Sequence, residues 1–552
     1  MTGFTLSFDL DHLLLFGAYK IGRSSFMKLA ISMRHKTAAT AATLLLLTGC
    51  GGGGSAGSGD DGGGLGPDAS LWEQRTAASD RQAAFCATPR SGNDPYNDNQ
   101  PYPDRQGSID DEKLWLKTYM HEVYLWNDEI PDATASRYTA AAYGSVPDAL
   151  DAYLDALKTP KVTASGKRKD DFSFTYPTDL WNASSMLGIE TSYGMQVTLL
   201  ASAPPRKAIV VYTDADTPAA YQGIGRGTEV LAIDGVDMIN DGTRAGVDTL
   251  NAGLFPATVG ESHRFTFRDR SGVTRNATLV SASLNSVPVE RVQTFETPAG
   301  RVGYLVFKEH IATAEGELIA ALTQLRDAGI TDLVLDMRYN GGGYLDIASE
   351  LAFMIAGQTR SSGRVFKQLR FNATNPLTRS PDSTVGFHVT SQGFDPSLDS
   401  GKALPELSLS RVFVLAGPGT CSASESLVNG LRGIGVQALL IGGTTCGKPY
   451  GFYAQDNCGL SYFAIEYSGD NDQGFGDYAD GFAPDCRVSD DYAHELGDPN
   501  EALLATALTW QQTGTCGTSS ATRAAAAQRQ ASETPQLLRG PLHENAWRRP
   551  PH

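Results

Sequence analysis

The fold of this chain is decided by Val412-Phe413-Val414-Leu415, then Thr420-Cys421-Ser422-Ala423-Ser424-Glu425, then Ala438-Leu439-Leu440-Ile441 and Gly447-Lys448. Each short apolar run predicts a buried strand, and the segment that starts at Ser422 predicts a helix. A strand–helix–strand unit of this kind brings two loops to one edge of a sheet. We therefore expect Ser422 and Lys448 to meet there. A serine activated by a neutral lysine is a nucleophile.

Length and composition indicate a multidomain globular protein. The chain has 552 residues, of which 41% are hydrophobic and 19% charged, and its formal net charge is −17. This length is enough for more than one domain. An acidic chain without a basic stripe argues against nucleic acid as a partner.

The N-terminus has the pattern of an export signal. Lys28, Arg34 and Lys36 form a positive region, and an apolar stretch follows that is too short to span a membrane. The stretch ends in Leu47-Thr48-Gly49-Cys50, which resembles the lipobox of bacterial lipoproteins. This resemblance implies that residues 1–49 are removed, that Cys50 is lipidated and that the protein is an outer-membrane lipoprotein of the cell envelope. A plain signal peptide with a chance cysteine is the alternative.

Six further cysteines permit three disulfides in an exported protein. Sequence cannot choose between the connectivities. We expect Cys421–Cys446, which would join the serine loop to the lysine loop, together with Cys458–Cys486 and Cys86–Cys516. No pair has the spacing of metal ligands, so we expect no metal site.

Changes in composition along the chain predict its domains. Residues 50–80 are rich in Gly, Ser and Asp and predict a flexible tether. Residues 81–184 carry apolar residues at helical spacing and predict a small helical domain, with Trp115, Tyr124 and Trp126 in its core. A β-rich domain over 185–290, a core over 291–515 and a disordered tail over 516–552 complete the prediction.

The β-rich segment contains strand-like runs at 208–211, 229–233 and 263–267. Together with the small-residue segment 217–227, they resemble a PDZ domain. This resemblance implies that Tyr193, Gly194 and Met195 form a carboxylate-binding loop beside a groove that binds peptides as an added strand. Thr228 departs from the family, which usually has Asp there. An unrelated small β domain is the alternative.

From residue 300 onwards the pattern alternates between strand and helix. Strands are predicted at 302–307, 333–336, 411–416 and 438–442, and helices at 344–355, 422–432 and 500–511. This is the pattern of a largely parallel sheet in an α/β fold.

Ser422 and Lys448 each have an ordinary structural interpretation. Ser422 with Glu425 fits a helix capping box, and a helix N-terminus can also stabilise an oxyanion. Lys448 would act as a base only if burial favours its neutral form, whereas most lysines lie on the surface.

A third segment, Asp336-Met337-Arg338-Tyr339-Asn340-Gly341-Gly342-Gly343, follows the strand at 333–336. Its glycines would let a backbone N–H approach a substrate, although a simple turn would have the same composition. Gly442 to Lys448 also fits a phosphate loop, but Pro449 stands where a magnesium-binding Ser or Thr is required. A Ser-His-Asp triad remains possible by spacing, with His310, His388 and His494 available.

These motifs, in this order, resemble the C-terminal processing (tail-specific) serine peptidases over about residues 105–512. The resemblance implies a crotonase/Clp-like core and a Ser/Lys dyad that cuts proteins or peptides with free C-termini near those ends, without a cofactor. Carried over to this sequence, Ser422 is the nucleophile, Lys448 is the general base and Glu425 supports the site. Gly342 and Ala423 would supply oxyanion N–H groups.

The sequence departs from the family pattern at three points. Gly341 stands where Pro is usual, Phe452 stands where some members have Gln, and the interval between serine and lysine is one residue longer than in several members. The family also includes retinoid-binding relatives that lack peptidase function, which leaves a second function open. The alternative is a peptide- or lipophile-binding lipoprotein that uses the same scaffold without catalysis. The sequence does not indicate an oligomeric state.

Overall fold

The computed structural model describes residues 78–517 and 536–538. The predicted signal segment 1–49, the lipidation site Cys50 and almost all of the tether lie outside the described residues. Among the described residues, no helix combines the length and the apolar character needed to cross a membrane.

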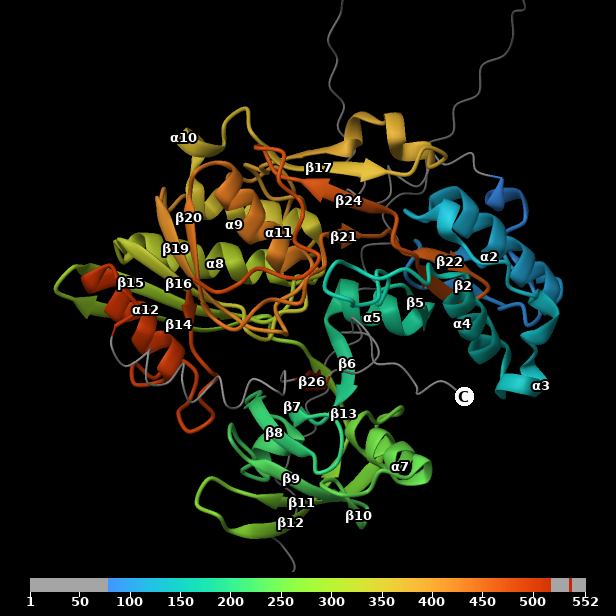
Figure 1. Cartoon of the computed structure of the whole chain (residues 1–552), viewed down its shortest axis with the longest axis horizontal. Helices are drawn as coiled ribbons and strands as arrows, with labels where there is room; N and C mark the ends of the chain where they lie inside the picture. Colours follow the sequence, from blue (N-terminus) through green and yellow to red (C-terminus); the bar gives the residue numbers. More distant parts are fainter. Residues whose placement is uncertain (1–77, 518–535, 539–552) are drawn as a thin grey trace, which may run out of the picture. The chain divides into compact units, whose positions relative to one another are not determined.

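Six strands form the central sheet, in the order β14-β15-β16-β19-β20-β25 (Figure 1). β14 and β15 pair antiparallel, and every later pair is parallel. The predicted, largely parallel sheet is confirmed. Its strands are β14 (Val289–Thr297), β15 (Gly300–Phe307), β16 (Asp332–Asp336), β19 (Arg411–Ala416), β20 (Gln437–Gly442) and β25 (Cys486–Arg487).

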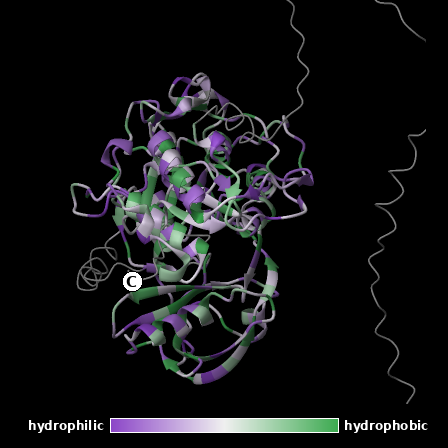
Figure 2. Ribbon diagram, turned by 90° about the vertical axis from the view of Figure 1, so that its right-hand side faces the viewer, coloured by the Kyte–Doolittle hydropathy of each residue, from purple (hydrophilic) through white to green (hydrophobic). Residues whose placement is uncertain are grey.

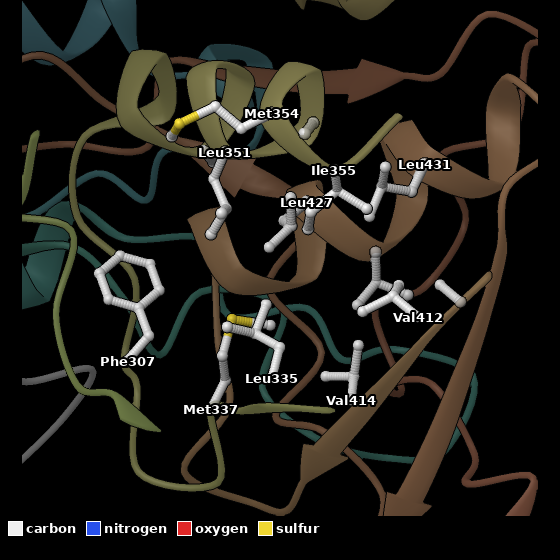
Figure 3. Close-up of a cluster of buried hydrophobic side chains, with 14 of the residues drawn as sticks. Phe307, Leu335, Met337, Leu351, Met354, Ile355, Val412, Val414, Leu427 and Leu431 are labelled. Atoms are coloured by element: carbon white, nitrogen blue, oxygen red, sulfur yellow. The ribbon is translucent and has the colours of Figure 1, made fainter. Parts of the chain in front are cut away.

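Helices cover both faces of this sheet because successive strand residues point to opposite sides. Leu335 of β16 packs in one apolar cluster with α8, α9 and α11, whereas Val334 packs in another with α12. Figure 3 shows Leu427 and Leu431 of α11 over Val412 of β19 in the first cluster. The helices are α8 (Ala314–Asp327), α9 (Leu345–Ala356), α11 (Ala423–Gly433) and α12 (Ala502–Thr513).

The N-terminal domain is built on helices, as predicted, and its sheet includes two strands from the core segment. Asp111 accepts a hydrogen bond from the Ser108 amide at 2.8 Å, which starts the first long helix. Trp115, Tyr124 and Trp126 are buried, which confirms the predicted core. Leu460, Tyr462, Ala464 and Ile465 from the core segment pack in the same cluster. The elements are α2 (Ile109–Val123), α3 (Ala140–Tyr143), α4 (Val146–Leu157), α5 (Thr178–Leu187) and β5 (Phe174–Pro177), which pairs with β23 (Leu460–Phe463) and through it with β22 (Gln455–Asn457).

The β-rich domain has one sheet in the order β12-β11-β9-β8-β7-β26, with β10 paired to β9. The three predicted strands are present as β8, β9 and β11. In Figure 2 green hydrophobic segments run along strands of the protein, while purple hydrophilic segments gather in outer turns. The elements are β6 (Ile189–Ser192), β7 (Met195–Ala201), β8 (Lys207–Thr213), α6 (Pro218–Tyr221), β9 (Glu229–Ile233), β10 (Val236–Asp237), α7 (Arg244–Leu254), β11 (Ser262–Arg268), β12 (Thr274–Val280) and β13 (Ala282–Asn285).

A separate sheet in the order β18-β17-β24-β21 lies beside the core helices (Figure 1). Phe366 of β17 is buried in the cluster that contains α9 and α11. The elements are α10 (Gln358–Ser361), β17 (Val365–Phe371), β18 (Thr384–Gly386), β21 (Tyr450–Gly451) and β24 (Tyr467–Asp470).

One of the three predicted disulfides is right and two are wrong. Cys421–Cys446 is present. Cys458 bonds to Cys86 because it lies in the turn between β22 and β23, the strand that joins the N-terminal domain. Cys486 of β25 bonds instead to Cys516, which follows α12.

The prediction of a wholly disordered tail over 516–552 is wrong at Cys516, which forms a disulfide, and at a short strand further on. Gln536–Leu538 forms β26, which pairs antiparallel with β7 of the β-rich domain. Leu538 is buried there, and its burial outweighs the polar composition of the surrounding sequence.

Candidate active site

Ser422 stands between strand β19 and helix α11, as predicted. It is the N-cap of α11 and is partly exposed, with φ 55° and ψ −112°. Residues other than glycine rarely adopt positive φ, and such strained positions cluster at functional sites. The backbone therefore presents this hydroxyl at the positive end of a helix in a conformation that the surrounding structure must enforce.

The lysine loop lies against the serine loop. The Cys421–Cys446 disulfide joins them with a Cα–Cα distance of 5.2 Å, and the Cys446 amide donates to the Thr420 carbonyl at 3.0 Å. After Lys448 the chain continues into strand β21 and not into a helix. The phosphate-loop interpretation is therefore wrong, because that loop opens a helix.

Glu425 organises both loops around one buried carboxylate. Its Oε2 accepts the amides of Ser422 at 3.1 Å and Lys448 at 2.8 Å. Its Oε1 accepts the Gly447 amide at 2.9 Å and the Thr445 hydroxyl at 2.6 Å. Burial raises the pKa of Glu425, and these donors act in the opposite direction. The predicted capping partner of Ser422 therefore also fixes the backbone of Lys448.

Aromatic rings cover the Lys448 side chain. Lys448 is 2% exposed, and its Nζ lies 4.2 Å from the ring centre of Phe452 and 5.2 Å from that of Phe172. Phe172 comes from the N-terminal domain, and Phe452 is the residue that departs from the family pattern. The lysine is thus buried, as a general base would require.

Gly342 lies directly against the start of α11. A Cβ at this position would lie 2.8 Å from the Ala423 nitrogen and 2.8 Å from the Ser422 Cβ, and its φ is 102°. Only glycine fits both constraints. The Gly342 N–H itself donates to Asn340 Oδ1 at 2.9 Å. The assignment of Gly342 and Ala423 as oxyanion donors stays a prediction.

Asn340 holds the glycine turn and the serine loop together, a role that the sequence did not reveal. Its carbonyl accepts the Cys421 amide at 3.0 Å and the Ser424 hydroxyl at 3.1 Å. Its side chain lies 3.0 Å from His310 Nδ1 and donates to the Phe307 carbonyl at 3.0 Å. The spacing of the motif gives no sign of these contacts, because they are made by the backbone and by a distant histidine.

The three histidines considered for a triad occupy different positions. His310 is fully buried behind Asn340, and burial lowers its pKa to about 4. His388 pairs with Asp346 at 2.7 Å and His494 with Asp491 at 2.7 Å. None of these contacts forms the serine–histidine link of a triad.

Lys367 of β17 is a second buried lysine close to the site, and no sequence motif marks it. Its Nζ donates to Ser426 Oγ of α11 at 3.0 Å and to the Pro449 carbonyl at 3.5 Å. Burial lowers its pKa to about 8, although the nearby charge of Glu425 acts to raise it. A lysine beside the buried Phe366 in a β-strand was the available signal.

The predicted peptide-binding loop lies at the start of β7. Gly194 has φ 74°, and a Cβ there would clash with Thr217 at 2.3 Å. The Tyr193 ring is buried against Phe265, so its side chain belongs to the domain core. Peptide contacts at Tyr193, Gly194 and Met195 stay a prediction and would come from the backbone.

One group of possible metal ligands occurs among the described residues, and its chemistry excludes metal binding. Cys421, Glu425 and Cys446 bring their sulfur and carboxylate atoms close together. The two sulfurs are bonded to each other, so neither is a thiolate. The expectation that the protein uses no cofactor stays a prediction.

Comparison with known proteins accounts for this arrangement. A family model described as peptidase family S41 matches residues 301–467, and the S41 N-terminal domain matches 111–174. The chain therefore contains the peptidase S41 domain together with the S41 N-terminal domain. Ser422, Lys448 and Gly342 all lie within the first match. Together with the named relatives below, the two matches confirm the predicted resemblance to the C-terminal processing peptidases.

Named relatives agree with the family matches, and one solved structure shares the fold. Carboxyl-terminal-processing proteases of Picosynechococcus sp. and Synechocystis sp. are 28% identical over 267 residues and 26% identical over 270 residues. Each match covers 46% of this chain and 54% or 53% of the relative, so the chain spans about half the length of these relatives. A Bacteroides fragilis protein assigned to the S41 proteases shares the fold, with a TM-score of 0.54, 22% identity, and coverage of 75% of this chain and 98% of that one.

The Glu425→Gln substitution tests the S41 site at its centre. Glutamine keeps the volume but has only one acceptor oxygen. Some of the backbone amides and the Thr445 hydroxyl that now bond to the carboxylate therefore lose their acceptor. Each unsatisfied donor costs about 1–3 kcal/mol of stability. Under a nucleophilic role for Ser422, which we propose, a shift of its hydroxyl by about 1 Å should lower kcat on the order of 100-fold. Both losses are measured, by chemical unfolding and by kcat of peptide hydrolysis.

Glu350→Gln is the matched control. Burial, together with the neighbouring Glu315, raises the pKa of Glu350 to about 10, so its side chain is neutral at neutral pH and glutamine imitates it. An equal fall in kcat in both variants would contradict the special role of Glu425.

The buried His310 predicts a pH dependence of stability. Its pKa is about 4 in the folded protein because burial disfavours the charged ring, and the ordinary value is 6.5. Between about pH 6.5 and pH 4 the unfolded chain binds a proton that the folded protein does not, so the free energy of unfolding falls as the pH drops. His310→Asn keeps a donor for Asn340 and should reduce this acid-induced loss by about 3 kcal/mol.

Unfolding of the parent and of His310→Asn is followed with urea at several pH values. Near pH 8, above the pKa of His310 in both the folded and the unfolded state, the difference in unfolding free energy between parent and variant reports packing alone. An unchanged pH profile in the variant would refute the assignment of the titration to His310.

Proposed function

We propose that this chain is a serine endopeptidase that cleaves protein or peptide substrates near their C-termini, with Ser422 as nucleophile and Lys448 as general base. The observation that carries the proposal is the Glu425 carboxylate, of which one oxygen accepts the backbone amides of both residues. Burial of Lys448 adds support, because burial disfavours the charged form of an amine.

In the proposed reaction, the neutral amine of Lys448 takes the proton from Ser422 Oγ as this oxygen attacks the substrate carbonyl carbon. The carbonyl oxygen becomes negative and is stabilised at the N-terminus of α11. The lysine ammonium then gives the proton to the leaving amine, and an acyl-enzyme remains. Water, deprotonated by the same amine, hydrolyses the ester and restores the serine.

The oxyanion donors in this proposal are the amides of Gly342 and Ala423. Because the Gly342 N–H donates to Asn340 Oδ1, the substrate oxyanion has to replace that acceptor. A negatively charged oxygen accepts a stronger hydrogen bond than a neutral amide oxygen. Substrate binding is therefore proposed to turn the Asn340 side chain away.

The β-rich domain is proposed to act as a PDZ-like peptide-binding domain. Support comes from the order of its elements, since the turn at Gly194 leads directly into β7, and β7 accepts an added antiparallel strand. Strand addition of this kind gives affinity through main-chain hydrogen bonds.

Substitution of the dyad tests the proposed reaction. Ser422→Ala removes the nucleophile and Lys448→Ala removes the base, so each should lower kcat by at least about 1000-fold. The assay is cleavage of an unfolded protein with a free C-terminus. Ser397→Ala and Lys402→Ala alter exposed residues of the same types and should keep full activity. Full activity in either dyad variant would refute the mechanism, and binding without turnover by the parent would favour a non-catalytic peptide- or lipophile-binding protein.

The protein is further proposed to be an exported lipoprotein of the outer membrane, attached through Cys50. The support is the Leu47-Thr48-Gly49-Cys50 sequence after a basic and apolar segment. Cells that express the parent should incorporate radiolabelled palmitate into this protein, whereas the Cys50→Ser variant should take up none and leave the membrane fraction. Cys86→Ser is the control, because its cysteine is not in the lipobox. Equal labelling of Cys50→Ser would exclude the anchor.

A further inference from the structure

The chain fills the outer edge of β7 with its own segment. β26 pairs with β7 in the register Gln536 to Leu199, Leu537 to Thr198 and Leu538 to Val197. The other edge of β7 pairs with β8. Figure 1 shows β26 beside β7, although in the sequence β26 lies far from all other strands of this sheet. A segment near the end of the sequence is thus an integral strand of the β-rich domain.

The two leucines of β26 point to different parts of the protein. Leu538 is 4% exposed and belongs to the apolar core of the β-rich domain, together with Val197 and Leu250. Leu537 packs against the cluster on the α12 side of the central sheet. Its Cδ2 lies 3.4 Å from the position of a Cβ built on Gly419, three residues before Ser422. The segment therefore contacts the β-rich domain and the serine loop at once.

The direction of β26 is that of a peptide whose C-terminal side approaches the Tyr193-Gly194-Met195 loop. The pairing is antiparallel, and Leu538, the last residue of the strand, is opposite Val197, near the start of β7. The Gln196 side chain also donates to the Leu538 carbonyl. A bound peptide that adds a strand to this edge would need the same backbone groups of β7.

We propose that Gln536–Leu538 is an internal ligand of the β7 edge, which substrate segments displace when they present an apolar residue in the place of Leu538. The role of this edge in substrate binding rests on the proposed function, whereas its occupation by β26 does not. The substrate class that follows is a polypeptide with a leucine-like residue close to its C-terminus. Leu538 supplies this specificity because it is the side chain that enters the domain core.

The competition is between an internal and an external strand. A segment of the same chain acts at an effective concentration on the order of millimolar, so even a weak three-residue strand keeps the edge occupied. If the edge is filled nine-tenths of the time, the apparent affinity for an external peptide is about tenfold weaker than the intrinsic affinity.

A binding measurement in the Ser422→Ala background tests the proposal without any turnover. The probe is a fluorescein-labelled peptide Glu-Thr-Pro-Gln-Leu-Leu, the sequence of residues 533–538, with a free carboxylate. The Leu538→Glu variant should bind it with a Kd about tenfold lower than the Leu538 chain does. Gln536→Glu adds the same charge at an exposed position of the same strand and should leave the Kd unchanged. A Kd that Leu538→Glu does not lower would overturn the proposal.

Hydrogen–deuterium exchange keeps the result interpretable if the variant is less stable. In Leu538→Glu, exchange should increase at residues 197–199 and return to the parent level when the peptide is added, while β9 stays protected. Loss of protection in β9 without peptide rescue would overturn the proposal, because Leu538 would then be only a core residue. If the Kd of the parent rises with protein concentration, the strand on β7 comes from a second copy of the chain. This result would overturn the internal origin of the ligand.

The activity assay separates this proposal from the proposed function. With the Ser422 chain, Leu538→Glu should lower KM for a substrate that ends in Leu-Leu and leave kcat unchanged. Binding that improves without any peptidase activity would refute only the proposed function. Peptidase activity with unchanged Kd and KM in Leu538→Glu would refute only the internal ligand.

Discussion

The arrangement of this site depends on one buried carboxylate. Glu425 is fully buried, and buried carboxyl oxygens need hydrogen-bond donors around them. Four donors surround it, and two of them are the backbone amides of Ser422 and Lys448. Through these hydrogen bonds Glu425 holds two loops from neighbouring parallel strands in contact. The Cys421–Cys446 disulfide limits the same separation covalently, so position is fixed by two independent constraints.

A buried network of ion pairs connects the glycine turn to the β-rich domain. Arg338 pairs with Asp336, Asp490 and Glu501 at 2.8–2.9 Å, and Arg226 of the β-rich domain also binds Asp490. Burial alone would raise the pKa of Asp490, but the two arginines lower it to about 2. A buried ion pair adds little to the free energy of unfolding, but removal of one partner lowers that free energy strongly. Its effect is to hold Tyr339, the residue before Asn340, against the neighbouring domain.

The sequence predicted the parts of this protein that local pattern determines. The strand–helix–strand unit, Ser422 with Glu425 and the Cys421–Cys446 bond all follow from elements close in sequence. Cys86–Cys458 could not be predicted, because it requires β23 to leave the core and pair with β5. Lys367 has no motif, and its importance comes from burial against α11. β26 was missed because three residues are too few to show a strand pattern.

Because β23 pairs with β5, the N-terminal domain is completed by a segment of the core. β5 pairs with β23, the Cys86–Cys458 bond ties the same segment, and Leu460 and Tyr462 complete the domain core. Through this shared structure Phe172 reaches the Lys448 amine. Aromatic cover excludes water, and exclusion of water strengthens every electrostatic interaction inside a site. The N-terminal domain is therefore one wall around the Lys448 side chain, and a core separated from it would leave this amine open to solvent.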